Sequence, residues 1–303
     1  MNRAKAPQPL ILIGIPTCMR PRMLAICLQS IGESALPENV EVRMVVADND
    51  FNESAREVVE EFACNAPFPV DYTVCAERGL SNIRNHLFDY AIKIGADYIA
   101  STDDDEGPVS ATWLSDLYTV IRETGGDAVG PVHGEYKAVK NPPLPSRNII
   151  ISARIYRNLK IRYDPLFNLT GGEDTDFGKR AIAAGAQFIA DPRCQANAWI
   201  ANPDTAPAEA RGHHQGGWFT LRRHYNRVRV LTYANRTKKQ KPATHILVEA
   251  VFYFIKGVVL LPFAIFSIEQ RLRCGKSFLK SVAYPMSLFG PGRYEPYRDM
   301  DGY

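Results

Sequence analysis

Residues 97–106 read Asp97-Tyr98-Ile99-Ala100-Ser101-Thr102-Asp103-Asp104-Asp105-Glu106, a short apolar segment that runs directly into four acidic residues. The first five residues have the length and composition of a buried strand. In open α/β sheets, ligands bind at the carboxyl ends of the strands. The stretch therefore predicts a strand together with a candidate ligand site at its end.

Strands and helices are predicted to alternate before this stretch. The first strand is the apolar run 10–15, and the helix after it begins at Pro21, with apolar residues at helical spacing. Further strands are predicted at 42–47 and 71–75, and further helices around 54–62 and over 81–94. Such alternation implies an α/β fold, a mostly parallel, doubly wound (Rossmann-like) sheet with helices on both faces.

The pattern is looser after residue 106. A Pro-rich loop is predicted at 141–146 and a strand at 148–155. The segment 171–184 is predicted to lead into a helix, with Glu173 and Asp174 at its start, where the helix dipole favours negative charge.

Composition places the chain among ordinary globular proteins. Its 303 residues, 46% apolar and 23% charged, allow one large domain or a main domain with an appendage. A net charge of +3 is too small to argue for nucleic acid as a partner. The six cysteines form no C-x-x-C pair and predict reduced thiols, and the apolar run that ends at Pro16 is too short for a signal peptide. We therefore expect the bulk of the protein in the cytoplasm.

Polar residues also follow the other predicted strands. The first strand ends at Pro16-Thr17, the second at Asp48-Asn49-Asp50, and the third precedes Arg78-Gly79-Leu80-Ser81-Asn82 and Arg84. Because the strands are predicted to be parallel, these residues would converge on one edge of the sheet, which indicates a ligand site there.

The acidic run itself suggests a metal. Three carboxylates on one short turn repel each other unless a cation sits among them, and oxygen ligands favour Mg²⁺ or Mn²⁺. Such an ion usually holds substrate phosphate oxygens. The alternative is a solvated turn that caps a helix over 110–124. The position at the end of a strand favours the metal.

Five motifs together resemble glycosyltransferase family 2, whose fold is GT-A. In chain order they are Ile15-Pro16-Thr17 with Arg20-Pro21, Val46-Ala47-Asp48-Asn49, Gly79-Leu80-Ser81-Asn82-Ile83-Arg84-Asn85, Asp103-Asp104-Asp105-Glu106 and Gly172-Glu173-Asp174-Thr175-Asp176-Phe177. The resemblance covers roughly residues 10–190. It is greatest to bacterial exopolysaccharide enzymes of the succinoglycan kind.

This resemblance implies a role for each motif residue. The residues that would contact the nucleotide sugar, for which we expect a UDP-sugar, are Pro16, Thr17, Asp48, Arg84, Asp103 and Asp104. Asp105, with Asp103, would bind the metal. Asp174 would be the catalytic base, with Glu173 positioning it or replacing it.

The chemistry of glycosyl transfer requires these residue types. A nucleoside diphosphate leaves with developing charge, which a metal can neutralise, and a carboxylate must take the proton of the acceptor hydroxyl. One base and a metal give direct displacement with inversion, as expected of a hexosyltransferase, whereas a glycosidase needs a second carboxyl as an acid. The alternative for 173–176 is a charged, capped helix start.

The C-terminal part has a different character, so we expect a domain at 1–220 and a basic, apolar helical tail at 221–303. Residues 222–241 contain eight Lys or Arg and no acid, and 246–268 are mostly apolar. Glu249 and Lys256 lie on one helical face, which makes a lone membrane span costly. We expect a hairpin bent at Pro262 that lies on the cytoplasmic face of the plasma (inner) membrane, and a buried core helix is the alternative.

The segment before this tail could face the acceptor, a saccharide or a lipid-linked precursor. The candidate residues for an acceptor diphosphate are His214, Trp218, Arg222 and Arg223, and the alternative is a flexible Gly-rich loop. Two other classes of function compete with glycosyl transfer for the whole chain. A sugar-nucleotide-forming enzyme or dinucleotide oxidoreductase is disfavoured because no Gly-x-Gly-x-x-Gly follows the first strand. A non-catalytic membrane-bound partner is disfavoured by the intact Asp105 and Asp174.

Overall fold

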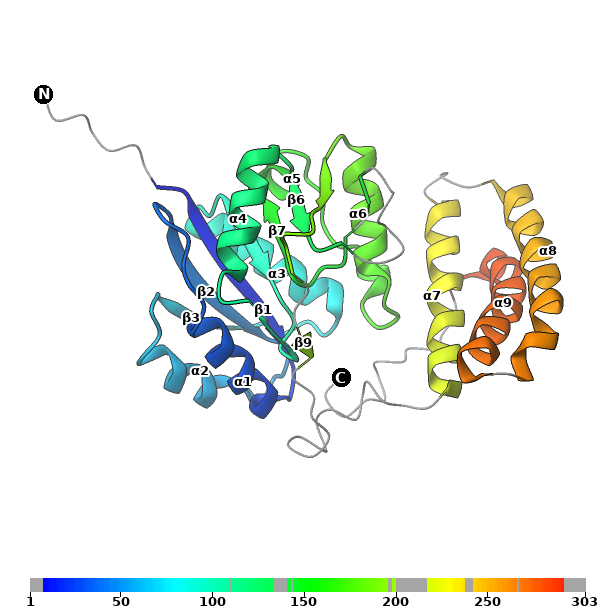
Figure 1. The fold of residues 1–303 in the computed structure, drawn as a ribbon, viewed down its shortest axis with the longest axis horizontal. Coiled ribbons are helices and arrows are strands. Elements are labelled where there is room, and N and C mark those ends of the chain that lie inside the picture. Colours follow the sequence, from blue (N-terminus) through cyan, green and yellow to red (C-terminus); the bar gives the residue numbers. More distant parts are fainter. Residues whose placement is uncertain are drawn as a thin grey trace, which may run out of the picture. The chain divides into compact units, whose positions relative to one another are not determined.

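The computed structural model describes residues 8–108, 110–132, 141–142, 144–195, 198–199, 217–237, 242–265 and 267–291. These residues form two compact units (Figure 1). The first unit contains the described residues up to Asn168 and those from Glu173 to 199, and the second contains Leu169–Gly172 and those from 217 to 291. The boundary expected between residues 220 and 221 lies within helix α7 (Gly217–Thr237) of the second unit.

The first unit is built on a seven-stranded sheet with the order β3-β2-β1-β4-β7-β6-β8. Its strands are β1 (Leu10–Thr17), β2 (Glu41–Asp48), β3 (Val70–Val74), β4 (Tyr98–Ser101), β6 (Ala128–Gly130), β7 (Ile149–Ser152) and β8 (Phe188–Ala190). Neighbours pair in parallel except at β4–β7 and β6–β7, so β7 alone among these strands runs against the others. A small second sheet pairs β5 (Glu106–Gly107) with β9 (Ala198–Trp199). The predicted α/β fold with a mostly parallel sheet is confirmed.

Helices cover both faces of the sheet, because alternate strand residues point to opposite faces. Ile11, Ile13 and Ile15 of β1 pack in one cluster with α1 (Pro21–Gly32) and α4 (Trp113–Thr124). Leu12 packs in the other cluster with α3 (Leu80–Ile94) and α6 (Glu173–Ala183). Two shorter helices complete the unit, α2 (Arg56–Ala63) and α5 (Ala153–Arg157). The β1 strand is therefore buried on both sides, as its continuous apolar run predicts.

The structure confirms only the first part of the strand predicted at 148–155. Its first part forms β7, but the chain turns into helix α5 at Ala153. The cause is Ser152, whose side chain accepts a hydrogen bond from the backbone N–H of Arg154 and so caps the helix. An apolar run alone does not reveal such a cap.

The second unit is a helical bundle of α7, α8 (Ala243–Leu260) and α9 (Ile268–Met286). The chain reverses through a 3-10 turn, Leu261–Ile265, which contains Pro262, the residue at which the sequence predicts a bend. The two helices on either side of this turn pack closely, because a Cβ atom at Gly257 would lie 3.0 Å from the ring of Phe278. α8 and α9 therefore form a hairpin.

A glycine fixes the start of α3 beside the candidate site. Gly79 has φ +129°, and its N–H donates to Asn49 Oδ1 at 2.9 Å. A Cβ atom there would lie 2.4 Å from the side chain of Asn168, whose carbonyl oxygen accepts from Leu80 N at 3.0 Å. The close approach and the positive φ leave no other residue type for this position.

We predict that Gly79→Ala lowers the free energy of unfolding by about 2 kcal/mol or more, through backbone strain and the clash with Asn168. The matched control is Gly95→Ala, which has φ +78° but open space around a Cβ atom, and which should lose about 1 kcal/mol. Urea unfolding of both variants measures the difference. Equal losses would show that Asn168 gives way and that the contact does not constrain this turn.

Candidate active site

The candidate active site lies at the carboxyl ends of β1, β2 and β4, where the sequence predicts it. Residues from the starts of α1 and α3 complete a cleft at this edge. The cleft is lined by Pro16, Thr17, Cys18, Arg20, Asn49, Leu80, Ile83, Arg84, Asp103 and Asp104. Most residues predicted to bind the nucleotide sugar are therefore gathered in one place.

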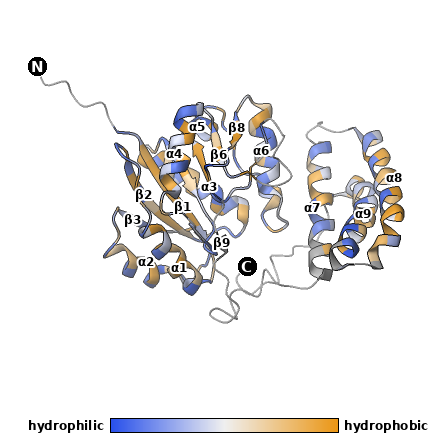
Figure 2. Ribbon diagram, in the orientation of Figure 1, coloured by the Kyte–Doolittle hydropathy of each residue, from blue (hydrophilic) through white to orange (hydrophobic). Residues whose placement is uncertain are grey.

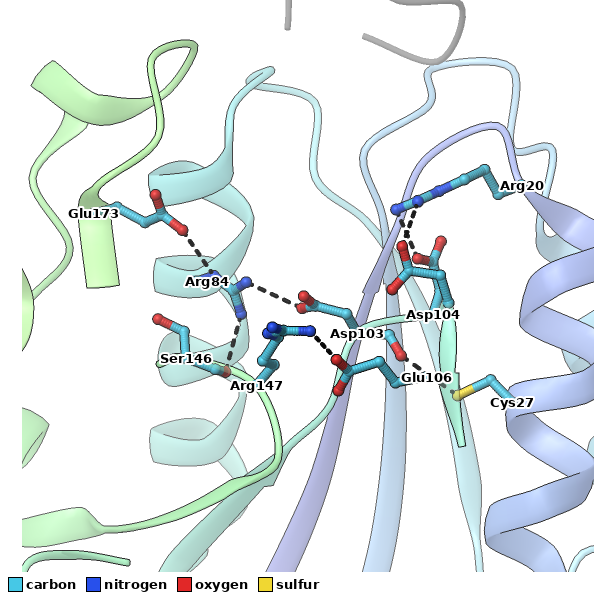
Figure 3. A network of polar contacts seen from close by, with 10 residues as sticks. Arg20, Cys27, Arg84, Asp103, Asp104, Glu106, Ser146, Arg147 and Glu173 are labelled. Carbon is cyan, nitrogen blue, oxygen red and sulfur yellow. Dashed lines mark hydrogen bonds and ion pairs between the residues drawn. The ribbon is translucent and has the colours of Figure 1, made fainter. Parts of the chain in front are cut away.

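Each carboxylate of the acidic run is paired with an arginine (Figure 3). Arg20 contacts Asp104 Oδ1 at 2.7 Å and Asp105 Oδ2 at 3.1 Å. Arg84 contacts Asp103 Oδ1 at 3.0 Å, and Arg147 is paired with Glu106. Three positive charges from distant parts of the sequence thus face four negative charges on one turn.

The pairing permits the run to be buried. The Asp104 side chain is fully buried and also accepts from Thr17 Oγ1 at 2.7 Å. Burial raises the pKa of Asp104 to about 7 and that of Glu106 to about 8, against the lowering effects of Arg20 and Arg147. Sequence reasoning assigned the opposing charge to a metal and missed the arginines. Arg20 stands in a motif that it quoted, but nothing local in the sequence reveals its partners.

The carboxylates of the acidic run suit a hard cation, although arginine side chains supply the positive charge beside them in this structure. Carboxylate oxygens are the ligands that Mg²⁺ and Mn²⁺ prefer, and Asp103, with 26% of its side chain exposed, lines the cleft. The Asp105 side chain is 3% exposed. Among the described residues, no three His, Cys, Asp or Glu side chains are grouped as a metal site. A cation on Asp103 and Asp105 would require Arg84 and Arg20 to shift.

Arg84 links the acidic run to the predicted catalytic pair at the start of α6. Its guanidinium contacts Asp103 on one side, while its Nε lies 3.7 Å from Glu173 Oε1 on the other (Figure 3). It also donates to the carbonyl oxygen of Ser146 at 3.2 Å. The predicted donor ligand Arg84 and the predicted catalytic residue Glu173 therefore meet in the structure.

The two acids of the catalytic pair have different surroundings. Burial, followed by repulsion from Asp174, raises the pKa of Glu173 to about 7, while Arg84 lowers it. Asp174 Oδ1 accepts from the backbone N–H of Thr175 at 2.6 Å and lies 3.2 Å from the Thr175 hydroxyl. Glu173 is thus oriented toward the acidic run through Arg84, and Asp174 is held by its own helix.

Asp48 is buried and already engaged by the protein. It accepts from Asp50 N at 2.9 Å, from Ala55 N at 3.0 Å and from the Tyr72 hydroxyl at 2.9 Å. Asn49 beside it donates to the carbonyl oxygens of Cys75 and Glu77, both at 2.9 Å. These contacts fix the loops beside the cleft, a role for Asn49 that sequence reasoning did not assign.

The structure does not describe the side chains of the residues predicted to bind the acceptor. His214 lies outside the described residues. Trp218, Arg222 and Arg223 belong to α7 of the second unit, and only their backbone is described. Their predicted role stays a prediction.

Comparisons with known proteins agree with this geometry. The model of the family described as glycosyl transferase family 2 matches residues 12–182. The succinoglycan biosynthesis protein ExoM of Rhizobium meliloti (strain 1021) is 32% identical over 212 residues, which cover 63% of this chain and 66% of that protein. The match therefore spans slightly less than two thirds of this relative.

Two solved structures share the fold. The mannosyltransferase PcManGT from Pyrobaculum calidifontis, in complex with GDP-Man and Mn²⁺, has a TM-score of 0.59 at 15% identity, covering 95% of this chain and 76% of that one. S. aureus TarS 1-349, in complex with UDP-GlcNAc, has a TM-score of 0.50 at 14% identity, covering 72% and 65%. At these identities the likeness concerns the fold.

We predict that the metal-free protein becomes less stable as the pH rises from about 5 to about 8. Asp104, Glu106 and Glu173 have folded pKa values of about 7, 8 and 7, above the ordinary 3.8 and 4.5, so the folded state keeps protons that the unfolded chain has lost. The contribution of these three protonated groups to the stability of the folded state is complete below about pH 4, and it is lost as the pH rises to about 8. The free energy of urea unfolding in a chelating buffer should fall by at least about 1 kcal/mol.

Glu106→Gln should make this pH dependence shallower, because a glutamine does not titrate. Glu60→Gln, which changes an exposed side chain on α2, should leave it unchanged. A pH dependence that is identical in the wild type and in Glu106→Gln would contradict the assignment to the acidic run.

Proposed function

Because the chain belongs to glycosyl transferase family 2, we propose that it is an inverting, metal-dependent glycosyltransferase. It would move a sugar from a nucleotide sugar onto a membrane-associated acceptor in bacterial exopolysaccharide synthesis, as the relative ExoM suggests. The observation that carries this proposal is the line of side chains from Asp103 through Arg84 to Glu173 across one cleft. These contacts connect Asp103, which is proposed to act on the leaving diphosphate, with Glu173, which lies beside the proposed base.

The donor side of the cleft suits a nucleoside diphosphate. Asp105 and Asp103 would hold a Mg²⁺ or Mn²⁺ ion, which neutralises charge on the departing diphosphate when it is bound. The Mn²⁺ of the PcManGT complex supports this assignment, and the UDP-GlcNAc of the TarS complex supports a UDP-sugar donor. Pro16, Thr17 and Asp48 shape the nucleotide side, and Asp48 acts there chiefly by holding the loop after β2.

We propose that the acceptor is activated at the start of α6. We assign the base to Asp174, which takes the proton of the acceptor hydroxyl as the new bond forms. Glu173 positions this end of α6 through its contact with Arg84. In this proposal Asp174 acts as a base and not as a nucleophile, so the acceptor displaces the diphosphate directly and the anomeric carbon is inverted.

We predict that Asp105→Ala loses both turnover and metal-dependent donor binding, because the ion loses its proposed ligand. Asp174→Asn should keep donor affinity but lose roughly a hundredfold or more in turnover, because it lacks the base. UDP release and calorimetry on a panel of nucleotide sugars measure the two effects.

The matched control is Asp89→Asn, which removes an exposed acid of α3 and should change neither quantity. If Glu173→Gln is inactive while Asp174→Asn is active, the two roles are exchanged. Full activity of Asp105→Ala in a chelator would exclude the metal assignment.

The second unit supports docking on a membrane. The segment Ala243–Ala264 is apolar and long enough to cross a bilayer, with only 11% buried (Figure 2). Val251, Phe252, Ile255 and Val259 are 57–61% exposed on one side of α8. Soluble proteins seldom leave such a continuous apolar face in water.

The opposite side of α8 faces α9 and includes the polar side chains of Glu249 and Tyr253. Glu249 is hydrogen-bonded to Tyr284, and the ring of Tyr253 stacks on that of Tyr284 with centroids 5.6 Å apart. Since α9 packs along α8 and carries Arg271 and Arg273, a crossing of the hairpin would place several cations in the hydrocarbon. We therefore propose that α8 lies in the interface of the cytoplasmic leaflet without spanning it.

We predict that Phe252→Glu with Ile255→Glu releases the protein from inner-membrane vesicles, because both charges fall on the apolar face of α8. Phe51→Glu, which alters an 83% exposed apolar residue of the first unit, is the control and should not release it. Sedimentation with vesicles measures the effect. Tags at both termini should resist external protease in sealed, right-side-out cells, and digestion of the C-terminal tag alone would show a crossing.

A further inference from the structure

A cluster of basic side chains lies between two helices of the second unit. His224 and Arg227 are one turn apart on α7, and Lys276 and Lys280 are one turn apart on α9. The helices are in close contact, since a Cβ atom at Gly275 would lie 3.1 Å from the side chain of Leu221. This contact brings the turn that holds His224 beside the turn that holds Lys276.

The imidazole of His224 is the centre of this cluster. Its Nε2 atom is buried and has no hydrogen-bond partner among the described residues. Burial and then the charges of Lys280, Lys276 and Arg227 lower its pKa to about 4. The charged groups that shift it are all cations.

Lys280 connects the cluster to α8. Its Nζ lies 3.4 Å from the hydroxyl of Tyr253 and 4.4 Å from the centroid of the Tyr253 ring. Tyr253 belongs to the helix whose other side is apolar and exposed. Positive charge and an uncovered apolar surface thus occur within one small bundle.

We propose that His224, Arg227, Lys276 and Lys280 form a binding site for the phosphate of an anionic lipid head group. This inference rests on the proposed docking of α8 in a membrane. A phosphate has several acceptor oxygens, which match a guanidinium fork, two ammonium groups and an imidazole N–H better than a single carboxylate does. A lipid is the proposed source because the cluster belongs to the same small bundle as the exposed apolar face of α8, which the proposed docking places in the membrane interface.

The test compares two double variants of the full chain. Lys276→Gln with Lys280→Gln removes two charges from the site, and Arg236→Gln with Arg271→Gln removes two charges from α7 and α9 elsewhere. Partitioning onto phosphatidylcholine vesicles that contain phosphatidic acid is measured by sedimentation. We expect the site variant to lose about tenfold more affinity than the control variant, because it loses direct contacts as well as diffuse attraction. Equal losses would overturn the site.

A second measurement observes the site directly. Short-chain phosphatidic acid should shift the imidazole NMR signals of His224, assigned with His224→Gln, and leave those of the exposed His245 on α8 unchanged. Inorganic phosphate at the same concentration should have little effect. An equal shift with inorganic phosphate would overturn the lipid assignment in favour of a soluble phosphate.

These measurements distinguish a failure of the phosphate site from a failure of the proposed function. Neither double variant changes a residue proposed for the donor, the metal or the base, so UDP release should be the same in both when a soluble acceptor is used. If the wild type does not bind vesicles at all, the membrane docking fails and the site fails with it. If the wild type binds and the site variant binds equally well, only the site fails.

Discussion

The structure of the first unit depends on the neutralisation of a buried acidic turn. Four carboxylates follow β4 into the protein interior, and an uncompensated charge of that kind would be costly. Arg20, Arg84 and Arg147 remove this cost, and each comes from a different part of the chain. Their positions in turn fix the start of α1, the first turn of α3 and the loop before β7. The cleft is therefore the space left between side chains that hold the acidic turn in place.

This arrangement sets guanidinium groups and carboxylates side by side in the lining of the cleft. A ligand with negative oxygens can contact the arginines, and a divalent cation can take over the aspartates. The link from Asp103 through Arg84 to Glu173 means that a change at Asp103 reaches the neighbour of the proposed base Asp174 through two contacts.

Local sequence patterns predicted the framework because its strands are continuous apolar runs and its helices have apolar residues at helical spacing. The position of the site was also predictable, since polar residues at the ends of parallel strands must meet. The arginine partners were not, because Arg20 and Asp105 are 85 positions apart and no periodicity relates them. The same limit applies to Asp48, whose hydrogen bonds to Tyr72 and Ala55 turn an expected ligand contact into an internal support. Ser152, which ends β7 and caps α5, was missed because a single cap is too weak a signal within an apolar run.

The spacing of these ion pairs also orders events during synthesis of the chain. Arg20 and Arg84 leave the ribosome before the acidic turn, whereas Arg147 and Glu173 follow it by dozens of residues. At translation rates of roughly 5–20 residues per second, Glu106 waits for seconds before its partner emerges. During that interval Glu106 is the one acidic side chain of the turn whose arginine partner has not yet emerged. The turn is therefore fully paired only after the loop before β7 has left the ribosome.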